Sequence, residues 1–274
     1  MRAEAGYWSE IAPAKINLAL HVRGRLTDGR HALETLFAFC VDGDRVSGTA
    51  AVDVSLEITG PFAEALGSGE DNLVLRAAHA LRERAGVRTG AALRLHKCLP
   101  VASGIGGGSA DAAATLRLLT ALWNIDPNEA AAIAPALGSD VPACLLGMTS
   151  RGEGAGDALE LVTDAGISGS PVLLVNPRVP LATGEVFARW DGVDRGPLGA
   201  DWRQGRNDLE LPARALVPEI GDVLDWLGKQ GGANFARMSG SGATCFALFD
   251  DEESCEEAAG ACPPQWWHLA SILR

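Results

Sequence analysis

The sequence predicts an α+β fold, in which strands and helices do not alternate strictly along the chain. Apolar residues alternate from Lys15 to Val22, which indicates a strand with one face in a core. A glycine-rich loop, residues 100–110, follows further strand-like segments and one helical segment. This loop joins a strand-like segment, 92–97, to a helix-like one, 112–123. We therefore place it at the centre of the fold.

The first strand carries two polar side chains of interest. Ile16 and Leu18 share one face with the apolar residues that follow, whereas Lys15 and Asn17 share the other. Lys15 and Asn17 therefore point the same way, either to solvent or toward a site. Further on, residues 52–58 are strand-like, and 72–84 have the apolar spacing of an amphipathic helix.

The glycine loop has the composition of an anion site. Gly104, Gly106, Gly107 and Gly108 can adopt positive φ and turn their N–H groups inward. Ser109 is a candidate N-cap of the helix, and Asp111 suits the positive end of its dipole. Free N–H groups at a helix N-terminus bind phosphate.

Two common phosphate loops do not fit. A Walker A loop places Lys and Ser or Thr after its last glycine, where this chain has Ser109 and Ala110. A dinucleotide fingerprint requires glycine at position 109 and an acidic residue about twenty positions later. The alternative to a phosphate site is a purely structural role, in which the glycine-rich turn only lets a strand and a helix pack closely.

The second half of the chain begins with a short helix, 128–137, predicted to break near Pro135. Asp140 precedes Val-Pro and is a candidate helix cap. The turn-rich segment 151–156 predicts a domain boundary, giving domains 1–156 and 157–274. Beyond it we expect a strand at 171–176, a helix start at 183–190, an exposed loop at 191–206, a helix at 220–227, a small-residue loop feeding a strand at 237–249, and an acidic surface helix at 252–261.

Composition limits the classes of partner. The chain has 274 residues, is 47% hydrophobic and carries a net charge of −12, which argues against nucleic acid and anionic membranes as partners. Any attraction for an anionic ligand must therefore be local. Only three lysines occur, Lys15, Lys97 and Lys229, so a lysine within a motif is informative.

The cysteines and the first residues suggest a cytoplasmic protein. The six cysteines form no CxxC pair and have no metal-ligand spacing with the five histidines, so free thiols and no protein metal site are expected. Residues 1–10 lack the apolar core of a signal peptide, and no apolar run is long enough to span a membrane.

Three stretches together resemble the motifs of the GHMP small-molecule kinases: Pro13-Ala-Lys-Ile-Asn-Leu18, the glycine loop from Pro100, and Met238-Ser-Gly-Ser-Gly-Ala-Thr-Cys245. Asp140 in Gly-Ser-Asp-Val-Pro142 adds a fourth. Asp28-Gly-Arg-His31, Asn176-Pro177 with Thr183 and Phe187, and Asn207-Asp-Leu-Glu210 are similar to the branch that phosphorylates 4-(cytidine 5'-diphospho)-2-C-methyl-D-erythritol in non-mevalonate isoprenoid synthesis.

The resemblance implies a two-domain GHMP kinase fold. Its N-terminal α/β domain is like a ribosomal small-subunit protein, its C-terminal domain is ferredoxin-like, and the active site lies in the cleft between them. It also implies ATP and Mg²⁺. The ATP-binding loop then comprises Pro100, Val101, Ala102, Ser103, Gly104, Ile105, Gly106, Gly107, Gly108, Ser109 and Ala110.

The family's catalytic lysine and aspartate fall on Lys15 and Asp140. Phosphoryl transfer depends on positioning and on charge stabilisation, so backbone amides can hold the phosphates without a lysine in the loop. The resemblance implies that Asp140 accepts the proton of the 2-hydroxyl of the methylerythritol unit. Lys15 would keep that carboxylate ionised and stabilise the developing alkoxide.

The substrate pocket implied by the resemblance contains Asn17, Arg30, His31, Thr183 and Phe187. His31 matches the position that hydrogen-bonds the cytosine edge; the alternative is a turn histidine bonded to its own loop. The family usually has tyrosine where this chain has Arg30. Arg30 either stacks on cytosine opposite Phe187 or is a solvent-exposed turn residue.

Two rival functions follow from the same motifs. Another GHMP kinase would phosphorylate homoserine, a sugar or a mevalonate-type alcohol, but those acceptors need no platform for a base. A non-catalytic nucleotide-binding relative would lack Lys15 or Asp140, and both are present. We expect a cytoplasmic monomer or weak homodimer whose partners are ATP and the cytidine compound.

Overall fold

The computed structural model describes residues 2–4, 6–66, 69, 71–163 and 165–274. The chain forms two compact units, each assembled from separate stretches. The first unit comprises Met1–Ala14, Asp42–Val101 and Gly106–Gly147. The second comprises Lys15–Val41, Ala102–Ile105 and Met148–Arg274.

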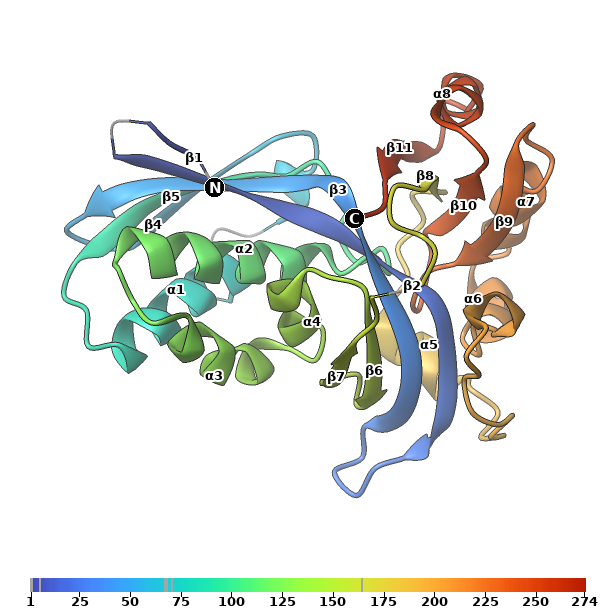
Figure 1. Cartoon of the computed structure of the whole chain (residues 1–274), viewed down its shortest axis with the longest axis horizontal. Coiled ribbons are helices and arrows are strands. Elements are labelled where there is room, and N and C mark those ends of the chain that lie inside the picture. The colour runs from blue at the N-terminus through green and yellow to red at the C-terminus, as the bar shows by residue number, and fades with distance from the viewer. Residues whose placement is uncertain (1, 5, 67–68, 70, 164) are drawn as a thin grey trace. The chain divides into compact units, whose positions relative to one another are not determined.

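The first unit is a sheet covered by helices. Its strands follow the order β1-β2-β3-β5-β4, and α1, α2 and α3 lie on one face of it (Figure 1). Ala91, Leu93 and Leu95 of β5 are buried while the residues between them are exposed, as an alternating strand requires. The elements are β1 (Arg2–Glu4), β2 (Tyr7–Arg25), β3 (His31–Ala51), β4 (Ser55–Thr59), the 3₁₀ turn η1 (Ala63–Ala65), α1 (Leu73–Arg84), β5 (Gly90–His96), α2 (Gly107–Leu122), α3 (Pro127–Leu137) and α4 (Val141–Leu146).

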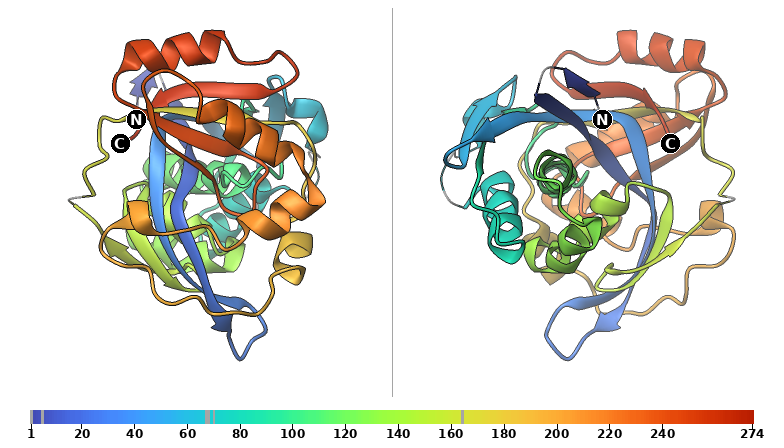
Figure 2. Two further views of the ribbon diagram at one scale, coloured as in Figure 1. Left: turned by 90° about the vertical axis from the view of Figure 1, so that its right-hand side faces the viewer. Right: turned by 60° about the vertical axis from the view of Figure 1, so that its left-hand side comes forward.

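The second unit contains a four-stranded antiparallel sheet of order β11-β8-β10-β9. Most of this sheet comes from the last part of the chain, which is drawn in orange and red in Figure 2. Leu173, Val175 and Cys245 face a core completed by Val223 of α7 and Ala258 of α8. The first half of β3 also belongs to this unit and pairs with β6. The elements are β6 (Ser150–Gly154), β7 (Ala158–Leu161), β8 (Pro171–Asn176), α5 (Thr183–Ala188), η2 (Trp202–Gln204), α6 (Glu210–Leu216), α7 (Glu219–Leu227), β9 (Ala233–Met238), β10 (Cys245–Phe249), α8 (Glu252–Gly260) and β11 (Trp267–Ile272).

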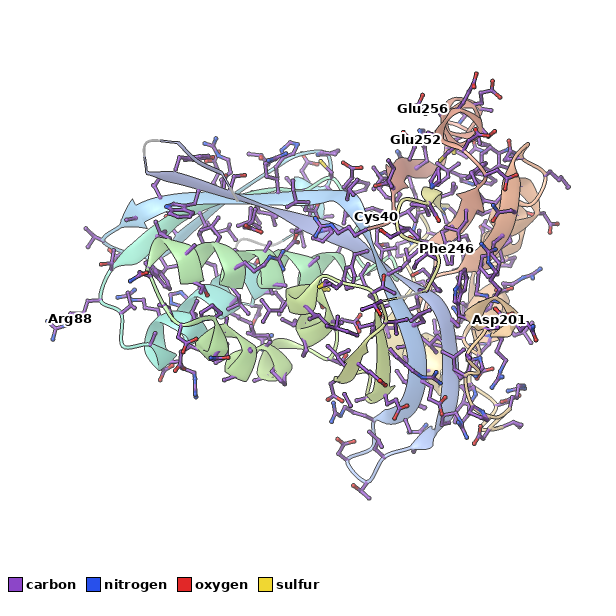
Figure 3. The ribbon with its side chains drawn as sticks, viewed as in Figure 1. Cys40, Arg88, Asp201, Phe246, Glu252 and Glu256 are labelled. Atoms are coloured by element: carbon purple, nitrogen blue, oxygen red, sulfur yellow. The ribbon has the colours of Figure 1, made fainter. Side chains whose placement is uncertain are left out.

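Several predicted elements are confirmed. Helix α1 starts after Asn72, whose side chain accepts a hydrogen bond from the Val74 N–H. Strand β8 has the predicted bounds, and α5 begins at Thr183. Helix α8 is the acidic surface helix, with Glu252 and Glu256 directed outward (Figure 3).

Two local predictions need correction. Helix α3 is not broken near Pro135 but continues to Leu137, with Pro135 inside its last turn. The segment 151–156 is a turn only at its end, since Arg151–Gly154 pair with Leu33–Leu36 as part of β6. Gly152 is required there because an added Cβ would lie 2.7 Å from the Phe37 ring. The domains 1–156 and 157–274 stay a prediction.

The segment 191–206 is mostly exposed, as predicted, but it is anchored. Trp202 is buried within η2. The Glu34 carboxylate accepts a hydrogen bond from the Leu198 N–H at 2.7 Å. The Nε2 atom of His21 accepts one from the Arg206 N–H at 3.1 Å. Side chains of β2 and β3 therefore fix this loop.

Candidate active site

Lys15 and Asn17 form a buried polar cluster in the second unit. The Lys15 ammonium donates to the Asn17 side-chain oxygen at 2.9 Å and lies 5.2 Å from the centre of the Phe37 ring. The Asn17 amide donates to the Thr35 hydroxyl at 2.8 Å, which donates to the Ala19 carbonyl at 2.7 Å. The prediction that Lys15 and Asn17 share a face is confirmed. Lys15 is 3% exposed, so the solvent-facing alternative was wrong.

Ser239 connects the first and third motifs to the glycine loop. Its hydroxyl accepts a hydrogen bond from the Asn17 N–H at 3.1 Å and donates to the Gly104 carbonyl at 3.0 Å. Gly104 has φ +77°, and a Cβ there would lie 2.6 Å from the carbonyl oxygens of Ser239 and Gly242. The Thr244 N–H donates to Ser103. Glycine at 104 therefore permits a close approach of two backbones, which fixes the residues of the loop that belong to this unit.

Helix α2 begins earlier in the loop than predicted. Its N-cap is Gly106, at φ +64°, rather than Ser109, because a glycine in the left-handed region makes the turn into the helix. Gly107, Gly108 and Ser109 form the first turn, where backbone N–H groups have no partner within the helix. These are the donors that a phosphate requires.

A buried ion triad lies behind the first turn of α2. The Lys97 ammonium is 2.5 Å from the Asp44 carboxylate and 2.6 Å from that of Asp111. Asp44 also accepts from the Leu99 N–H at 2.8 Å. A Cβ on Gly107 would lie 3.1 Å from the Lys97 ammonium, so the triad touches the start of the helix. The placement of Asp111 at the helix dipole was wrong, because its carboxylate points into the core toward Lys97.

Burial and the neighbouring charges set the pKa values of the triad in opposite directions. Burial would lower the pKa of Lys97, but Asp111 and Asp44 outweigh it and raise the pKa above its usual range. Burial raises the pKa of Asp111 to about 7, although the Lys97 charge opposes this. The second oxygen of Asp111 is buried without a hydrogen-bond partner, which agrees with a carboxyl that holds a proton readily.

Asp140, in the first unit, occupies the N-cap position of α4. Its carbonyl accepts from the Cys144 N–H at 3.0 Å, but its side chain makes no capping hydrogen bond. The capping interpretation is therefore right for the position and wrong for the side chain. Asp140 is half-buried, and its carboxylate is not used to begin the helix.

The predicted base-binding residues form an aromatic cluster in the second unit. The rings of His31 and Phe187 stack with centroids 4.6 Å apart, and Trp190 contacts His31 edge-on at 5.6 Å. Burial lowers the pKa of His31, assisted by the charge of Arg25, so the ring is neutral at pH 7. The Nε2 atom of His31 is buried without a partner in this structure. Sequence reasoning missed Trp190, although an aromatic residue three positions after Phe187 was a usable signal.

Arg30 and Thr183 lie beside other polar groups. The Arg30 guanidinium is 2.8 Å from Asp28 and 3.3 Å from Asp157, and the side chain is 53% exposed. In this structure Arg30 is therefore an exposed turn residue. The Thr183 hydroxyl lies 2.9 Å from that of Ser241, which comes from the small-residue loop.

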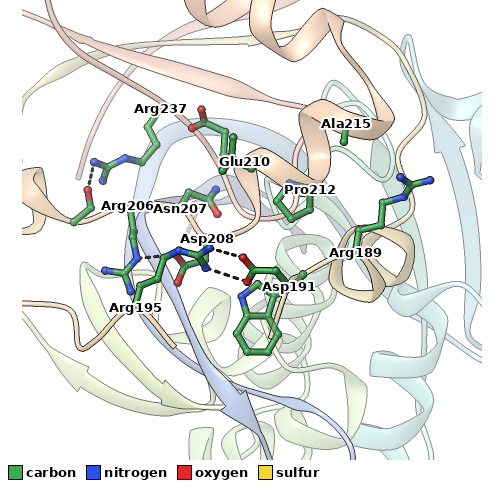
Figure 4. A pocket seen from close by; sticks show the side chains of 13 residues that line it. Arg189, Asp191, Arg195, Arg206, Asn207, Asp208, Glu210, Pro212, Ala215 and Arg237 are labelled. Carbon is green, nitrogen blue, oxygen red and sulfur yellow. Dashed lines mark hydrogen bonds and ion pairs between the residues drawn. The ribbon is translucent and has the colours of Figure 1, made fainter. Parts of the chain in front are cut away.

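A cavity of about 640 Å³ in the second unit was not predicted (Figure 4). Its walls come from the end of α5, the loop 191–206 and α6, and they carry four arginines. Arg195 is bonded to Asp191, Arg206 to Asp208, and Arg237 to backbone carbonyls, so most of this charge is already used. The lining residues include Trp190 but neither Lys15 nor any residue of the glycine loop.

The cysteines and the acidic side chains were also compared with the predictions. None of the six cysteines forms a disulfide, and four of them are buried. Over the part of the chain that the structure describes, His, Cys, Asp and Glu side chains form no group of three that could hold a metal ion. None of the helices in the described ranges is long and apolar enough to cross a membrane.

Comparison with known proteins gives consistent matches along the chain. The models of the GHMP kinases N terminal domain and the GHMP kinases C terminal match residues 72–148 and 196–268. A 4-diphosphocytidyl-2-C-methyl-D-erythritol kinase of Rhizorhabdus wittichii is 53% identical over 278 residues, covering 97% of this chain and 94% of that protein. One of Sphingopyxis alaskensis is 51% identical over 278 residues, covering 97% and 98%. A crystal structure of 4-(cytidine 5'-diphospho)-2C-methyl-D-erythritol kinase superposes with a TM-score of 0.82 at 34% identity, covering 97% of this chain and 99% of that one.

Proposed function

The chain belongs to the GHMP kinases and, within them, to the 4-diphosphocytidyl-2-C-methyl-D-erythritol kinases, and from this premise we propose how its residues perform the reaction. ATP donates its γ-phosphoryl group to the 2-hydroxyl of 4-(cytidine 5'-diphospho)-2-C-methyl-D-erythritol. The acceptor oxygen forms a bond to the γ-phosphorus, the bond from that phosphorus to the bridging oxygen breaks, and ADP leaves.

The residues Pro100–Ala110 hold the phosphates of ATP in this proposal. The first-turn N–H groups of Gly107, Gly108 and Ser109 donate to phosphate oxygens at the positive end of α2. The contacts of Gly104 with Ser239 support the proposal, because they fix the loop before a ligand arrives. The net charge of −12 does not oppose binding, since charges farther than about 8 Å away are screened.

Asp140 takes the proton of the acceptor hydroxyl, and Lys15 stabilises the negative charge that develops on the oxygen. The position of Asp140 supports its role, because it is half-buried directly before the first turn of α4. Burial of Lys15 beside Asn17 supports its role, because a cation acts more strongly where water is excluded.

The cytidine end is held by the second unit. Asn17, Arg30, His31, Thr183 and Phe187 bind the acceptor substrate, with His31 hydrogen-bonded to the cytosine edge and Phe187 stacked on the ring. The unpartnered Nε2 atom of His31 supports this assignment. Arg30 borders the pocket from the turn, where its guanidinium is bonded to Asp28 and Asp157 rather than stacked on the base.

The phosphoryl donor in this proposal is ATP together with Mg²⁺. Mg²⁺ normally retains waters and takes one or two carboxylates together with the phosphates of its substrate. Among the described residues no three-ligand cluster is ready for it, so we propose that it binds as the complex with ATP. When bound, it would neutralise charge on the transferring phosphate.

The protein acts in the cytoplasm as a monomer or weak homodimer, without nucleic-acid or membrane partners.

The observation that carries the proposal is the buried Lys15–Asn17–Ser239–Gly104 connection among the three family motifs. The test is release of ADP from MgATP with the cytidine compound, homoserine, mevalonate or galactose as acceptor. Activity confined to the cytidine compound is expected, whereas activity on another alcohol would overturn the acceptor assignment.

The base assignment is tested by Asp140→Asn, with Asp126→Asn as its control. Asp126 caps the neighbouring helix α3, and asparagine caps equally well, so both variants should fold. We expect Asp140→Asn to bind ATP and turn over at least about 10²-fold more slowly, since general-base catalysis contributes about 10²–10⁴-fold. Normal turnover by Asp140→Asn would exclude it as the base.

A further inference from the structure

Two buried nitrogen atoms in the aromatic cluster lack hydrogen-bond partners. They are Nε2 of His31 and Nε1 of Trp190, whose rings contact each other edge-on at 5.6 Å. A buried donor without a partner loses its hydrogen bonds to water and gains nothing in return. Two such atoms in adjacent rings indicate a site that a ligand completes.

The backbone places Trp190 firmly beside Phe187. The two residues are linked by a turn in which the Trp190 N–H donates to the Phe187 carbonyl at 3.2 Å, just after α5. Trp190 is one of the residues that line the 640 Å³ cavity, whereas His31 and Phe187 are not among them. The His31 ring is therefore stacked on Phe187 and met edge-on by Trp190, which in turn borders the cavity.

The chemistry of the two nitrogens selects the ligand. An indole N–H donates only, so its partner must be an acceptor. The neutral imidazole of His31 offers one donor and one acceptor. Cytosine presents acceptors and a donor along one edge of a flat ring and stacks on aromatic side chains.

We propose that Trp190 is a further substrate-binding residue, which donates its Nε1–H to an acceptor on the cytosine edge and supplies an aromatic wall of the base pocket. The inference rests on the proposed function and deepens it. It also accounts for the missing tyrosine at position 30, since Arg30 is bonded to Asp28 and Asp157. In this proposal the indole of Trp190 takes the place of the tyrosine ring that the family usually has at position 30.

The test compares Trp190→Phe with Trp226→Phe. Phenylalanine preserves an aromatic ring and removes the donor. Trp226 is a matched control because it also contacts a ring edge-on, that of Trp266, but belongs to a different aromatic pair. We expect Trp190→Phe to raise KM for the cytidine substrate and the Kd for cytidine diphosphate, measured by calorimetry, about tenfold. KM for ATP and kcat should stay within about twofold of the native values, as a loss of uniform binding predicts.

A second variant separates binding from folding. Trp190→His restores a ring N–H and should recover part of the affinity for cytidine diphosphate. If Trp190→Phe lowers the free energy of unfolding but leaves KM and Kd unchanged, Trp190 is structural and the inference is wrong. If the native protein itself fails to phosphorylate the cytidine compound, the proposed function fails instead, and that result is distinct.

Discussion

Lys97 and Lys15 are two of the three lysines of the chain, and both are buried, but their surroundings differ. Lys97 lies between the carboxylates of Asp44 and Asp111, all within the core of the first unit. Lys15, in the second unit, donates to an amide oxygen and lies over the Phe37 ring. Two carboxylates commit the Lys97 charge to the fold, whereas the Lys15 ammonium donates to Asn17, a residue of the proposed substrate site.

This difference between Lys97 and Lys15 explains why the scarcity of lysine in the sequence does not by itself indicate a catalytic residue. The scarcity of lysine marks both positions, but a buried cation is retained either to balance buried acids or to act on a substrate. Only the partners distinguish the two cases. Substitution of each lysine by methionine tests the distinction, with the exposed Lys229 as a control of the same type.

The largest effect on stability is expected for Lys97→Met. It leaves two buried carboxylates side by side without their cation, and breaking a buried ion pair in this way costs about 3–5 kcal/mol. Urea unfolding followed by circular dichroism measures the loss. A cost close to that of Lys229→Met would mean that the triad does not stabilise the first unit.

Lys15→Met should reverse the pattern. We expect the free energy of unfolding to fall by less than it does in Lys97→Met, because the Lys15 substitution leaves the Asn17 amide, rather than two buried carboxylates, without the cation. Turnover should fall about 10²–10³-fold, the usual effect of removing one group that stabilises transition-state charge. Folding and single-turnover measurements on the same preparation decide the point. If Lys15→Met keeps full activity, or loses as much stability as Lys97→Met, the proposed difference between a catalytic Lys15 and a structural Lys97 is wrong.

The last prediction concerns the pH dependence of stability. The pKa of Asp111 is about 7 in the folded chain and near its ordinary value of 3.8 when unfolded, so the folded state binds more protons between these values. Its contribution to stability is therefore present at low pH and is lost as the pH rises toward 7.

Asp111→Asn should flatten the pH dependence of the free energy of unfolding between about pH 4 and 7. The exposed Asp53→Asn serves as the control, because its carboxyl lies outside the core. Unfolding curves at several pH values give the slopes. Parallel curves for the native protein and Asp111→Asn would show that Asp111 titrates normally in the fold.

Local signals in the sequence were sufficient for many elements. Asn72 before an amphipathic run, the alternation of 92–96 and the apolar run 171–176 each correspond to an observed element. Helix α6 was missed because it has only seven residues and contains Pro212. Strand β6 was missed because glycines that resemble a turn lie against the ring of Phe37.

The site was predictable only where motifs carried it. The motifs identify Lys15, Asn17 and Gly104, and the structure brings these residues together. The triad could not be predicted, because Lys97 and Asp44 are 53 positions apart and no periodicity links them. Trp190 was also missed, since its role depends on the position of His31, which lies far from it in the chain.

The second unit is closed by residues from both ends of the chain. Cys40 forms an antiparallel bridge with Leu273, and the Arg274 N–H donates to the Phe39 carbonyl at 2.9 Å. Leu36 and Phe37 find their partners in β6, whereas Phe39 and Cys40 find theirs only in Leu273 and Arg274. During synthesis the Phe39–Cys40 end of this apolar strand therefore stays unpaired longest, and an exposed apolar strand edge of this kind is prone to aggregate.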